Sequence, residues 1–405
     1  MKYILPTLLF GFLMFVISFT TDRTVKTEPN LQISFSSIEK HLENAPYQQF
    51  GAVFKYFFEQ SDCPGAAIVV VKDTSVIIMD GLGVKTVNST DSVDTNTIFR
   101  LGSVSKGFTG ILTGMLVNKK YLDWDTKVKE HVPDFVLNDE KQASNIEIRH
   151  LLSHTTGLPL HSYTNLLEED MGIKEIMPKL KSVDLISKEG QLMSYQNVAF
   201  AIIEEVLKSS TNKSFEQLLE DNIFTPANMR HSSCSILTID STSNMAMPHR
   251  WNSVSKKYYP TKQNNKYYNA PSAGGINTSI SDASQWLQIL LGNRPDIVPL
   301  HVLDSVFAPE VSTSRNRKYF NRWSGVKKSY YAKGWRVIEF GSRTIMHHGG
   351  YVNQYRSEIA VDRKNKLAIC VLFNAPSRHS SQVVPLFFSY CDSLDNIQLR
   401  KSTLN

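Results

Sequence analysis

Residues 99–106 read Phe-Arg-Leu-Gly-Ser-Val-Ser-Lys, and an apolar helix pattern continues from there to Met115. This stretch predicts a strand or loop that turns into a buried helix at Ser103. Ser103 and Lys106 are three residues apart, so they share one helix face and the lysine can reach the serine oxygen. A serine hydroxyl is a poor nucleophile at neutral pH unless a neighbouring base removes its proton. The stretch therefore predicts a nucleophilic serine beside a lysine.

The Ser-x-x-Lys spacing is weak by itself, because it occurs five times in the sequence. The other four instances begin at Ser37, Ser210, Ser253 and Ser324. None of these opens a buried apolar helix, and one lies within residues 251–269, a Lys-, Tyr- and Asn-rich stretch typical of a surface excursion. Context therefore favours Ser103 as the nucleophile.

Strand patterns occupy both ends of the chain. A predicted hairpin covers residues 66–71 and 75–79, and four short strand patterns follow at 335–340, 343–347, 356–361 and 367–373. The middle of the chain is mostly helical pattern broken by loops. The simplest arrangement is an α+β fold, a three-layer α/β structure with a discontinuous antiparallel sheet, plus an inserted all-helical lobe.

These patterns predict one catalytic domain over residues 38–395. Its α/β lobe is expected at about 38–100 and 330–395, and its helical lobe at about 101–329. A cleft between two such lobes is a natural place for a ligand.

The N-terminus reads as an export signal. Met1 and Lys2 precede an apolar run from Ile4 to Phe19, which is followed by polar residues. Residues 1–25 are therefore predicted to be a secretory signal peptide or an uncleaved N-terminal membrane anchor, and residues 26–37 a linker. The protein is expected to be exported, either periplasmic or secreted.

Composition narrows the partners. The chain has 405 residues and a net charge of +6, without a Lys/Arg run dense enough for nucleic-acid binding. Its four cysteines show no metal-ligand spacing, and they define neither a disulfide pairing nor a disulfide framework. The sequence leaves the oligomeric state open.

Residues 99–106 also resemble the first motif of class C β-lactamases and of the related penicillin-binding peptidases and esterases. Further segments resemble motifs of this family in the family's order: Leu-Leu-Ser-His-Thr-Thr-Gly-Leu-Pro at 151–159, Tyr-Gln-Asn at 195–197, Gly-Gly-Ile-Asn-Thr-Ser at 274–279 and His-His-Gly-Gly at 347–350. The resemblance covers about residues 40–375. It implies a β-lactamase/transpeptidase-like fold.

The resemblance also implies roles for individual residues. The implied catalytic residues are Ser103, Lys106 and Tyr195. The implied substrate-binding residues are Asn197, His347, His348, Gly349 and Gly350. Ser103 would form an acyl-enzyme, while Lys106 and Tyr195 would share the general-base work. No metal or cofactor is implied, because the serine mechanism needs none.

The resemblance implies three more specific roles in binding the substrate and stabilising the oxyanion. Asn197 would donate a hydrogen bond to Lys106 or to the substrate amide. The backbone N–H groups of Ser103 and Gly350 would form the oxyanion hole. His347 would point inward from its strand and line the pocket.

The third motif departs from the family pattern, which has Lys-Thr-Gly or His-x-Gly. With His347 in the first position, the second position holds His348 in place of threonine. The register His348-Gly349-Gly350 is an alternative, and this one-residue slip reverses which side chain faces the pocket. Because histidine is only partly cationic at pH 7, the departure argues against efficient β-lactam hydrolysis and leaves serine acyl transfer intact.

The predicted function is a serine hydrolase that acts through an acyl-enzyme on an amide, β-lactam or ester bond of a small molecule or peptide. The alternative is a penicillin- or peptidoglycan-binding protein of the same fold without turnover. A zinc hydrolase is disfavoured, because His150 and His154 have helical spacing but no His-Glu-x-x-His motif accompanies them. A purely structural exported protein explains none of the motif order.

Overall fold

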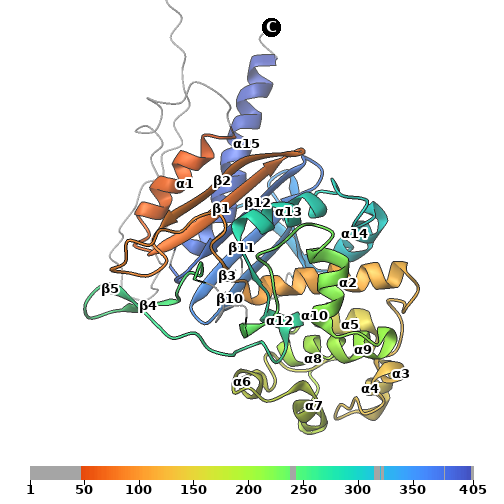
Figure 1. Cartoon of the computed structure of the whole chain (residues 1–405). Helices are drawn as coiled ribbons and strands as arrows, with labels where there is room; N and C mark the ends of the chain where they lie inside the picture. The colour runs from red at the N-terminus through yellow and green to blue at the C-terminus, as the bar shows by residue number, and fades with distance from the viewer. Residues whose placement is uncertain (1–46, 238–242, 314–319, 321–322, 378, 403–405) are drawn as a thin grey trace, which may run out of the picture.

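The chain is described here by a computed structural model that covers residues 47–237, 243–313, 320, 323–377 and 379–402. An eight-stranded antiparallel sheet lies at its centre (Figure 1). In spatial order its strands are β2 (Ser75–Gly83), β1 (Gly65–Lys72), β12 (Leu367–Phe373), β11 (Tyr355–Asp362), β10 (Arg343–Val352), β9 (Arg336–Phe340), β8 (Val326–Tyr331) and β7 (Val311–Ser312). The predicted signal or anchor and the linker lie outside the described residues.

The two ends of the chain meet in the middle of this sheet. β1 pairs with β12, so that Val69 lies opposite Cys370. Both strands are apolar along almost their whole length, and every residue of β12 is buried. A strand reads as a continuous apolar run when helices cover both faces of its sheet. The discontinuous antiparallel sheet predicted from the sequence is therefore present.

Helices cover both faces and complete the three layers (Figure 1). The outer face carries α1 (Phe50–Glu59) and α15 (Val383–Ser402), whose Phe50 and Phe387 rings meet edge to face at 4.9 Å. On the inner face α13 (Ile280–Leu290) packs against β1, β2 and β12. Beside it lie α2 (Ser105–Asn118) and α14 (Leu300–Phe307).

The helical portion gathers below the sheet in Figure 1. Its helices are α3 (Val128–His131), α4 (Glu140–Asn145), α5 (Ile148–Leu152), α6 (Thr164–Glu168), α7 (Ile173–Ile176), α8 (Asn197–Ala201), α9 (Ile203–Thr211), α10 (Phe215–Leu219) and α12 (Pro271–Gly274), with the helical turns η4 (Met177–Ser182) and η5 (Glu220–Phe224). The turn η3 (Gly102–Val104) packs against β10 and β11 of the large sheet. Two small sheets lie outside the large one: β3 (Phe99–Arg100) pairs with β6 (Asn277–Thr278), and β4 (His249–Asn252) pairs with β5 (Lys257–Pro260).

The large sheet takes up strands that precede the predicted end of the helical lobe at about residue 329. β7 and most of β8 fall before it, yet both belong to the large sheet, and α13 packs on that sheet. The strand signal was weak because β7 has two residues and β8 is a polar strand in which Lys327 and Lys328 are exposed. Lysine is typical near the edge of a sheet, where it blocks pairing with other chains.

Within the described residues, no helix combines the length and the apolar composition that crossing a membrane requires. The four cysteines, Cys63, Cys234, Cys370 and Cys391, are buried and carry free thiols.

Candidate active site

Ser103 lies at a junction of strand and helix, as the sequence predicts. β3 leads through the turn η3 into α2, and the turn leaves Ser103 partly exposed between buried neighbours. Gly102 has a φ of +53°, and a Cβ there would lie 2.8 Å from the backbone nitrogen of Tyr351. Only glycine fits both the conformation and this close approach. The turn thus presents the Ser103 hydroxyl beside strand β10.

Lys106 is buried directly beneath the serine. Its Nζ lies 3.4 Å from the Ser103 Oγ and donates to the Asn197 Oδ1 at 2.8 Å and to the Ala273 backbone oxygen at 2.6 Å. Burial lowers the pKa of Lys106 well below its usual value, and the positive charge of Arg336 lowers it further. A lysine amine that is neutral near physiological pH can take the proton of a serine hydroxyl.

Asn197 is held between the lysine and a second polar pair. Its Nδ2 donates to the Tyr267 hydroxyl oxygen at 2.8 Å, and that hydroxyl donates to the Glu168 Oε1 at 3.2 Å. The prediction that Asn197 donates to Lys106 is wrong, since its amide oxygen faces the lysine and accepts. Donation from Asn197 to a substrate amide stays a prediction.

Sequence reasoning missed Tyr267 and Glu168. Tyr267 belongs to the stretch 251–269, which was interpreted as a surface excursion, yet it is only 8% exposed. The first part of that stretch forms the β4–β5 hairpin, whereas its end folds back under Asn197. No periodic pattern marks this return, because it is made by side chains of a loop.

Tyr195 lies on the other side of the lysine. The Lys106 Nζ is 4.8 Å from the centroid of the Tyr195 ring, and the Arg336 guanidinium carbon is 5.6 Å from it. A cationic group near an aromatic ring is attracted by the partial negative charge of the ring face. The structure therefore brings Tyr195 to the site, while its share in the general-base work stays a prediction.

The register of the third motif is now defined. His348 faces the site, with its Nε2 3.0 Å from the Tyr331 hydroxyl and its ring 6.3 Å from that of Tyr195. His347 points to the opposite face of β10, where its Nε2 lies 2.8 Å from the Glu358 Oε2. The expectation that His347 points into the pocket is therefore wrong, because neighbouring residues of a strand face opposite sides.

His347 is instead part of the outer layer. Its ring packs 4.7 Å from the Trp323 ring, and Glu358 also accepts from the Arg356 Nε at 3.0 Å. Burial lowers the pKa of His347, although the Glu358 carboxylate opposes this effect. His347 thus belongs to the packing beneath α15 and not to the site.

Gly350 lies against the serine turn. A Cβ on Gly350 would be 1.9 Å from the Leu101 backbone oxygen, so only glycine allows β10 to come this close. The contact is reinforced by the Ser357 hydroxyl, which donates to the same oxygen at 2.6 Å. The strand segment from Gly349 to Tyr351 therefore lies next to Ser103, and the oxyanion role of the Gly350 N–H stays a prediction.

Arg336 is a further residue that the sequence did not reveal. It begins β9, pairs with His347 across the ladder, and is 9% exposed. Its guanidinium lies 5.3 Å from the centroid of the Tyr331 ring, in addition to its contact with Tyr195. Nothing in the motifs points to it, because an isolated arginine at a strand start looks like a surface residue.

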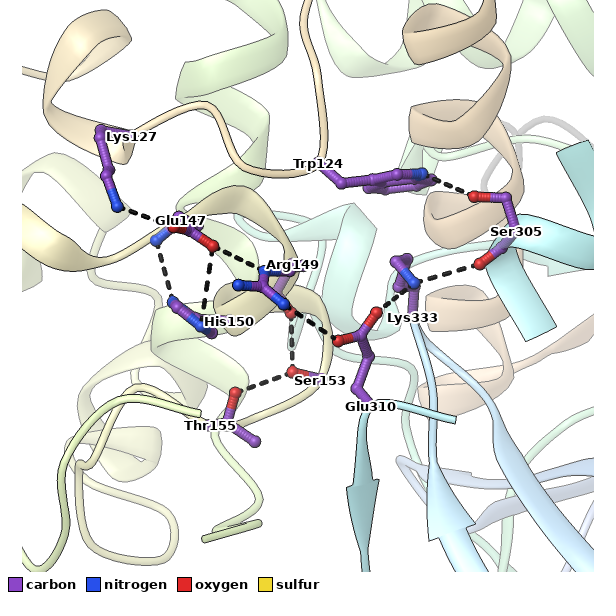
Figure 2. Close-up of polar contacts among 10 residues, drawn as sticks. All are labelled: Trp124, Lys127, Glu147, Arg149, His150, Ser153, Thr155, Ser305, Glu310 and Lys333. Carbon is purple, nitrogen blue, oxygen red and sulfur yellow. Dashed lines mark hydrogen bonds and ion pairs between the residues drawn. The ribbon is translucent and has the colours of Figure 1, made fainter. Parts of the chain in front are cut away.

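A cavity of about 420 Å³ lies away from the serine. It is lined by Lys127, Asn145, Glu147, Arg149, His150, Thr155, Glu189, Gly190, Gln191 and Glu310. Figure 2 shows Lys127 and Arg149 converging on Glu147, at 2.7 and 2.6 Å, and Lys333 reaching Glu310. These pairs neutralise most of the charge of the cavity wall and fix the segment 147–155.

The two histidines of this segment have separate partners. The His150 Nδ1 accepts from the Glu147 backbone N–H at 3.1 Å, and the His154 Nδ1 accepts from the Gln196 backbone N–H at 3.1 Å. In the part of the chain that the structure describes, no three His, Cys, Asp or Glu side chains are grouped so that they could hold a metal ion.

Known proteins resemble this chain over most of its length. It is 25% identical over 343 residues to "Unguisins hydrolase ungD'" of Aspergillus campestris (strain IBT 28561), which covers 82% of this chain and 62% of that protein. It is 24% identical over 348 residues to "Protein flp" of Staphylococcus aureus (strain MW2), which covers 85% of this chain and 66% of that protein. The chain thus spans less than two thirds of either relative.

A solved structure and a family profile agree with this resemblance. The octameric penicillin-binding protein homologue from Pyrococcus abyssi superposes with a TM-score of 0.71 at 19% identity, over 84% of this chain and 77% of that chain. This likeness confirms the predicted β-lactamase/transpeptidase-like fold. The profile of the family described as Beta-lactamase matches residues 48–385. The chain therefore belongs to the Beta-lactamase family.

Proposed function

We propose that the protein hydrolyses an amide, β-lactam or ester bond through an acyl-enzyme on Ser103. One observation carries this proposal: a fully buried amine, that of Lys106, lies 3.4 Å from the Ser103 Oγ. A buried lysine with no carboxylate among its hydrogen-bond partners in the described residues loses its proton far more readily than a solvated one. It therefore supplies the base that a serine nucleophile needs.

In the proposed reaction the Ser103 Oγ attacks the substrate carbonyl and its proton passes to Lys106, with Tyr195 sharing the transfer. The new C–O bond forms as the carbonyl oxygen becomes an oxyanion. Backbone N–H groups of Ser103 and of the Gly350–Tyr351 segment would stabilise that charge. The proton then moves to the leaving amine or alcohol, and water releases the acid in a second, equivalent step.

The third motif bears on the substrate. Burial and the nearby Arg336 and Lys106 charges hold the pKa of His348 well below its usual range, so His348 is neutral at pH 7. In this chain the buried cation beside Tyr195 and Tyr331 is Arg336. A substrate carboxylate would therefore meet the positive charge of Arg336 and not a charged His348. A relative named as a hydrolase supports turnover as such.

The first test is the intact mass of the protein, followed over time after mixing with a penicillin and, in parallel, with a p-nitrophenyl ester. An adduct of wild type that is absent from Ser103→Ala identifies Ser103 as the nucleophile. An adduct that turns over within seconds indicates a β-lactamase, whereas one that lasts for hours indicates a peptidase-like or non-turning-over penicillin-binding protein. Wild type without an adduct or ester hydrolysis contradicts the proposal.

We also propose export, which rests on the sequence of residues 1–25 alone. Expression of the full chain with its N-terminus intact should give protein outside the cytoplasm. Its mass then separates the two forms, since a cleaved signal shortens the chain by roughly 20–25 residues and an anchor does not. Full-length protein that stays in the cytoplasmic fraction contradicts export.

A further inference from the structure

A chain of buried hydrogen bonds runs along one wall of the site. The Gln196 backbone N–H donates to the His154 Nδ1 at 3.1 Å. The Tyr331 hydroxyl oxygen lies 3.2 Å from the His154 Nε2 and 3.0 Å from the His348 Nε2. The chain ends where the His348 Nδ1 lies 2.8 Å from the Gly349 backbone oxygen. The His154, Tyr331 and His348 side chains are at most 1% exposed.

The two ends of this chain determine its direction. A backbone N–H can only donate, so the His154 Nδ1 accepts and the proton of a neutral His154 sits on Nε2, which donates to Tyr331. A backbone carbonyl can only accept, so the His348 Nδ1 carries a proton and donates to Gly349. The Tyr331 hydroxyl is left to donate to the His348 Nε2. The two histidines are thus opposite tautomers.

Burial and the charges around these hydrogen bonds favour the neutral form of both imidazoles. Burial lowers the pKa of His154 and of His348 well below the usual range, and the Lys106 and Arg336 charges act in the same direction. The groups facing His348 are Lys106 from α2, Arg336 from β9, Tyr331 from β8 and Tyr195 from the helical portion, while His347 of its own strand acts on it only through charge from the opposite face. A further positive charge beside the Arg336 guanidinium would be strongly disfavoured.

This series of hydrogen bonds connects the segments that carry the predicted motifs. Gln196 lies between Tyr195 and Asn197, so its N–H anchors that motif to the segment of His154. His154 has a φ of +59°, an uncommon conformation for a residue other than glycine, and the Ser194 N–H donates to its carbonyl at 2.9 Å. At the other end Gly349 belongs to β10, beside the serine turn.

We propose that Tyr331 is a positioning residue of the active site. Its hydroxyl group holds His154 and His348 in complementary tautomers and thereby fixes the Tyr195–Asn197 segment against β10. This role rests on the proposed acyl-transfer function. It also assigns His348 a purely structural use of both ring nitrogens, so that His348 acts neither as a base nor as a cation for the substrate.

Tyr331→Phe tests this role with the loss of one oxygen atom. The variant removes the acceptor of His154 and the donor to His348, while the ring and its contacts remain. We expect kcat/KM for an ester substrate to fall about 10- to 100-fold, mainly through kcat, because small misplacements of catalytic groups cost rate. Tyr330→Phe is the matched control on the same strand and should stay within about twofold of wild type.

Nitrogen NMR of histidine-labelled protein supplies a readout that a merely structural tyrosine would not change. Wild type should show His348 protonated on Nδ1 alone, without titration between about pH 5.5 and 8.5. Tyr331→Phe should change the tautomer or the titration of His348, and Tyr330→Phe should not. This measurement on wild type needs no variant, so it holds even if Tyr331→Phe folds poorly.

The outcomes separate the two proposals. A wild-type His348 that carries its proton on Nε2, or that titrates in this range, overturns the positioning role. An active wild type whose Tyr331→Phe variant keeps its kcat and its His348 signals overturns it as well. A wild type that hydrolyses no ester, amide or β-lactam overturns the proposed function. The positioning role of Tyr331 in catalysis is then overturned with it.

Discussion

At the scale of single residues, the proposed reaction depends on a buried lysine, Lys106, that can give up its proton. Burial and the Arg336 charge lower the pKa of Lys106, so activity should fall as pH falls through that pKa. In Arg336→Gln the pKa of Lys106 rises, and the acid limb of log kcat/KM should move up by about one pH unit. Arg149→Gln is the control, because Arg149 lines the separate cavity. Its acid limb of log kcat/KM should stay at the wild-type pH.

The residue scale also shows where prediction from sequence ends. Ser103 and Lys106 could be found because they open a buried helix, which has a clear apolar signal. His347 and His348 could not be distinguished, since two adjacent histidines fit either register of a strand. The structure resolves them through their neighbours, Glu358 on one face and Tyr331 on the other. Those neighbours belong to other strands, β11 and β8, and no local pattern around the histidines indicates them.

At the scale of elements, α12 is the short helix whose Ala273 carbonyl accepts from Lys106. Its Ser272 N–H donates to the Glu204 carboxylate of α9 at 2.9 Å. Burial raises the pKa of Glu204 to about 8. A neutral carboxyl group at this contact therefore connects α9 to the helix that orients the lysine.

The raised pKa of Glu204 predicts a pH dependence of stability. The folded protein keeps this proton up to about pH 8, whereas the unfolded chain releases it near pH 4.3, so the stabilisation is complete below pH ~4 and is lost as pH rises to ~8. Glu204→Gln lacks this loss, and its Tm should exceed that of wild type at pH ~8.5 but not at pH ~4.5. An equal pH dependence of Tm in wild type and Glu204→Gln would contradict this prediction. The control is Glu205→Gln, because Glu205 is the neighbouring carboxylate and pairs with Lys174.

The element scale also explains why the sequence did not predict β7 and β8. The central strands β1 and β12 could be predicted because both faces are covered and the sequence is continuously apolar. β8 alternates buried and partly buried residues only over its last half, and its first half carries two exposed lysines. β8, the strand next to the edge, owes its place to backbone pairing with β9 and β7, and backbone pairing leaves little trace in side-chain composition.

At the scale of the whole molecule, a buried arginine joins the sheet to the last helix. Arg343 of β10 is 2.6 Å from Asp392 of α15 and 2.9 Å from Asp362 of β11, and the Asp362 side chain has no exposed surface. Arg343→Leu leaves that carboxylate buried without its cation and should lower the free energy of unfolding by about 3–5 kcal/mol. Urea denaturation measures this; Asp392→Asn, which keeps the Asp362 pair, should cost less, and equal losses would contradict the argument.

The four buried thiols lie in different layers of the same molecule. Cys63 and Cys391 are in the hydrophobic cluster beneath α1 and α15, whereas Cys234 and Cys370 are in the cluster shared by the sheet and the inner helices. An alkylating reagent can reach each thiol only after its own layer has opened. The order in which the four cysteines are labelled in the native protein would therefore record which layer separates first, with no engineered probe.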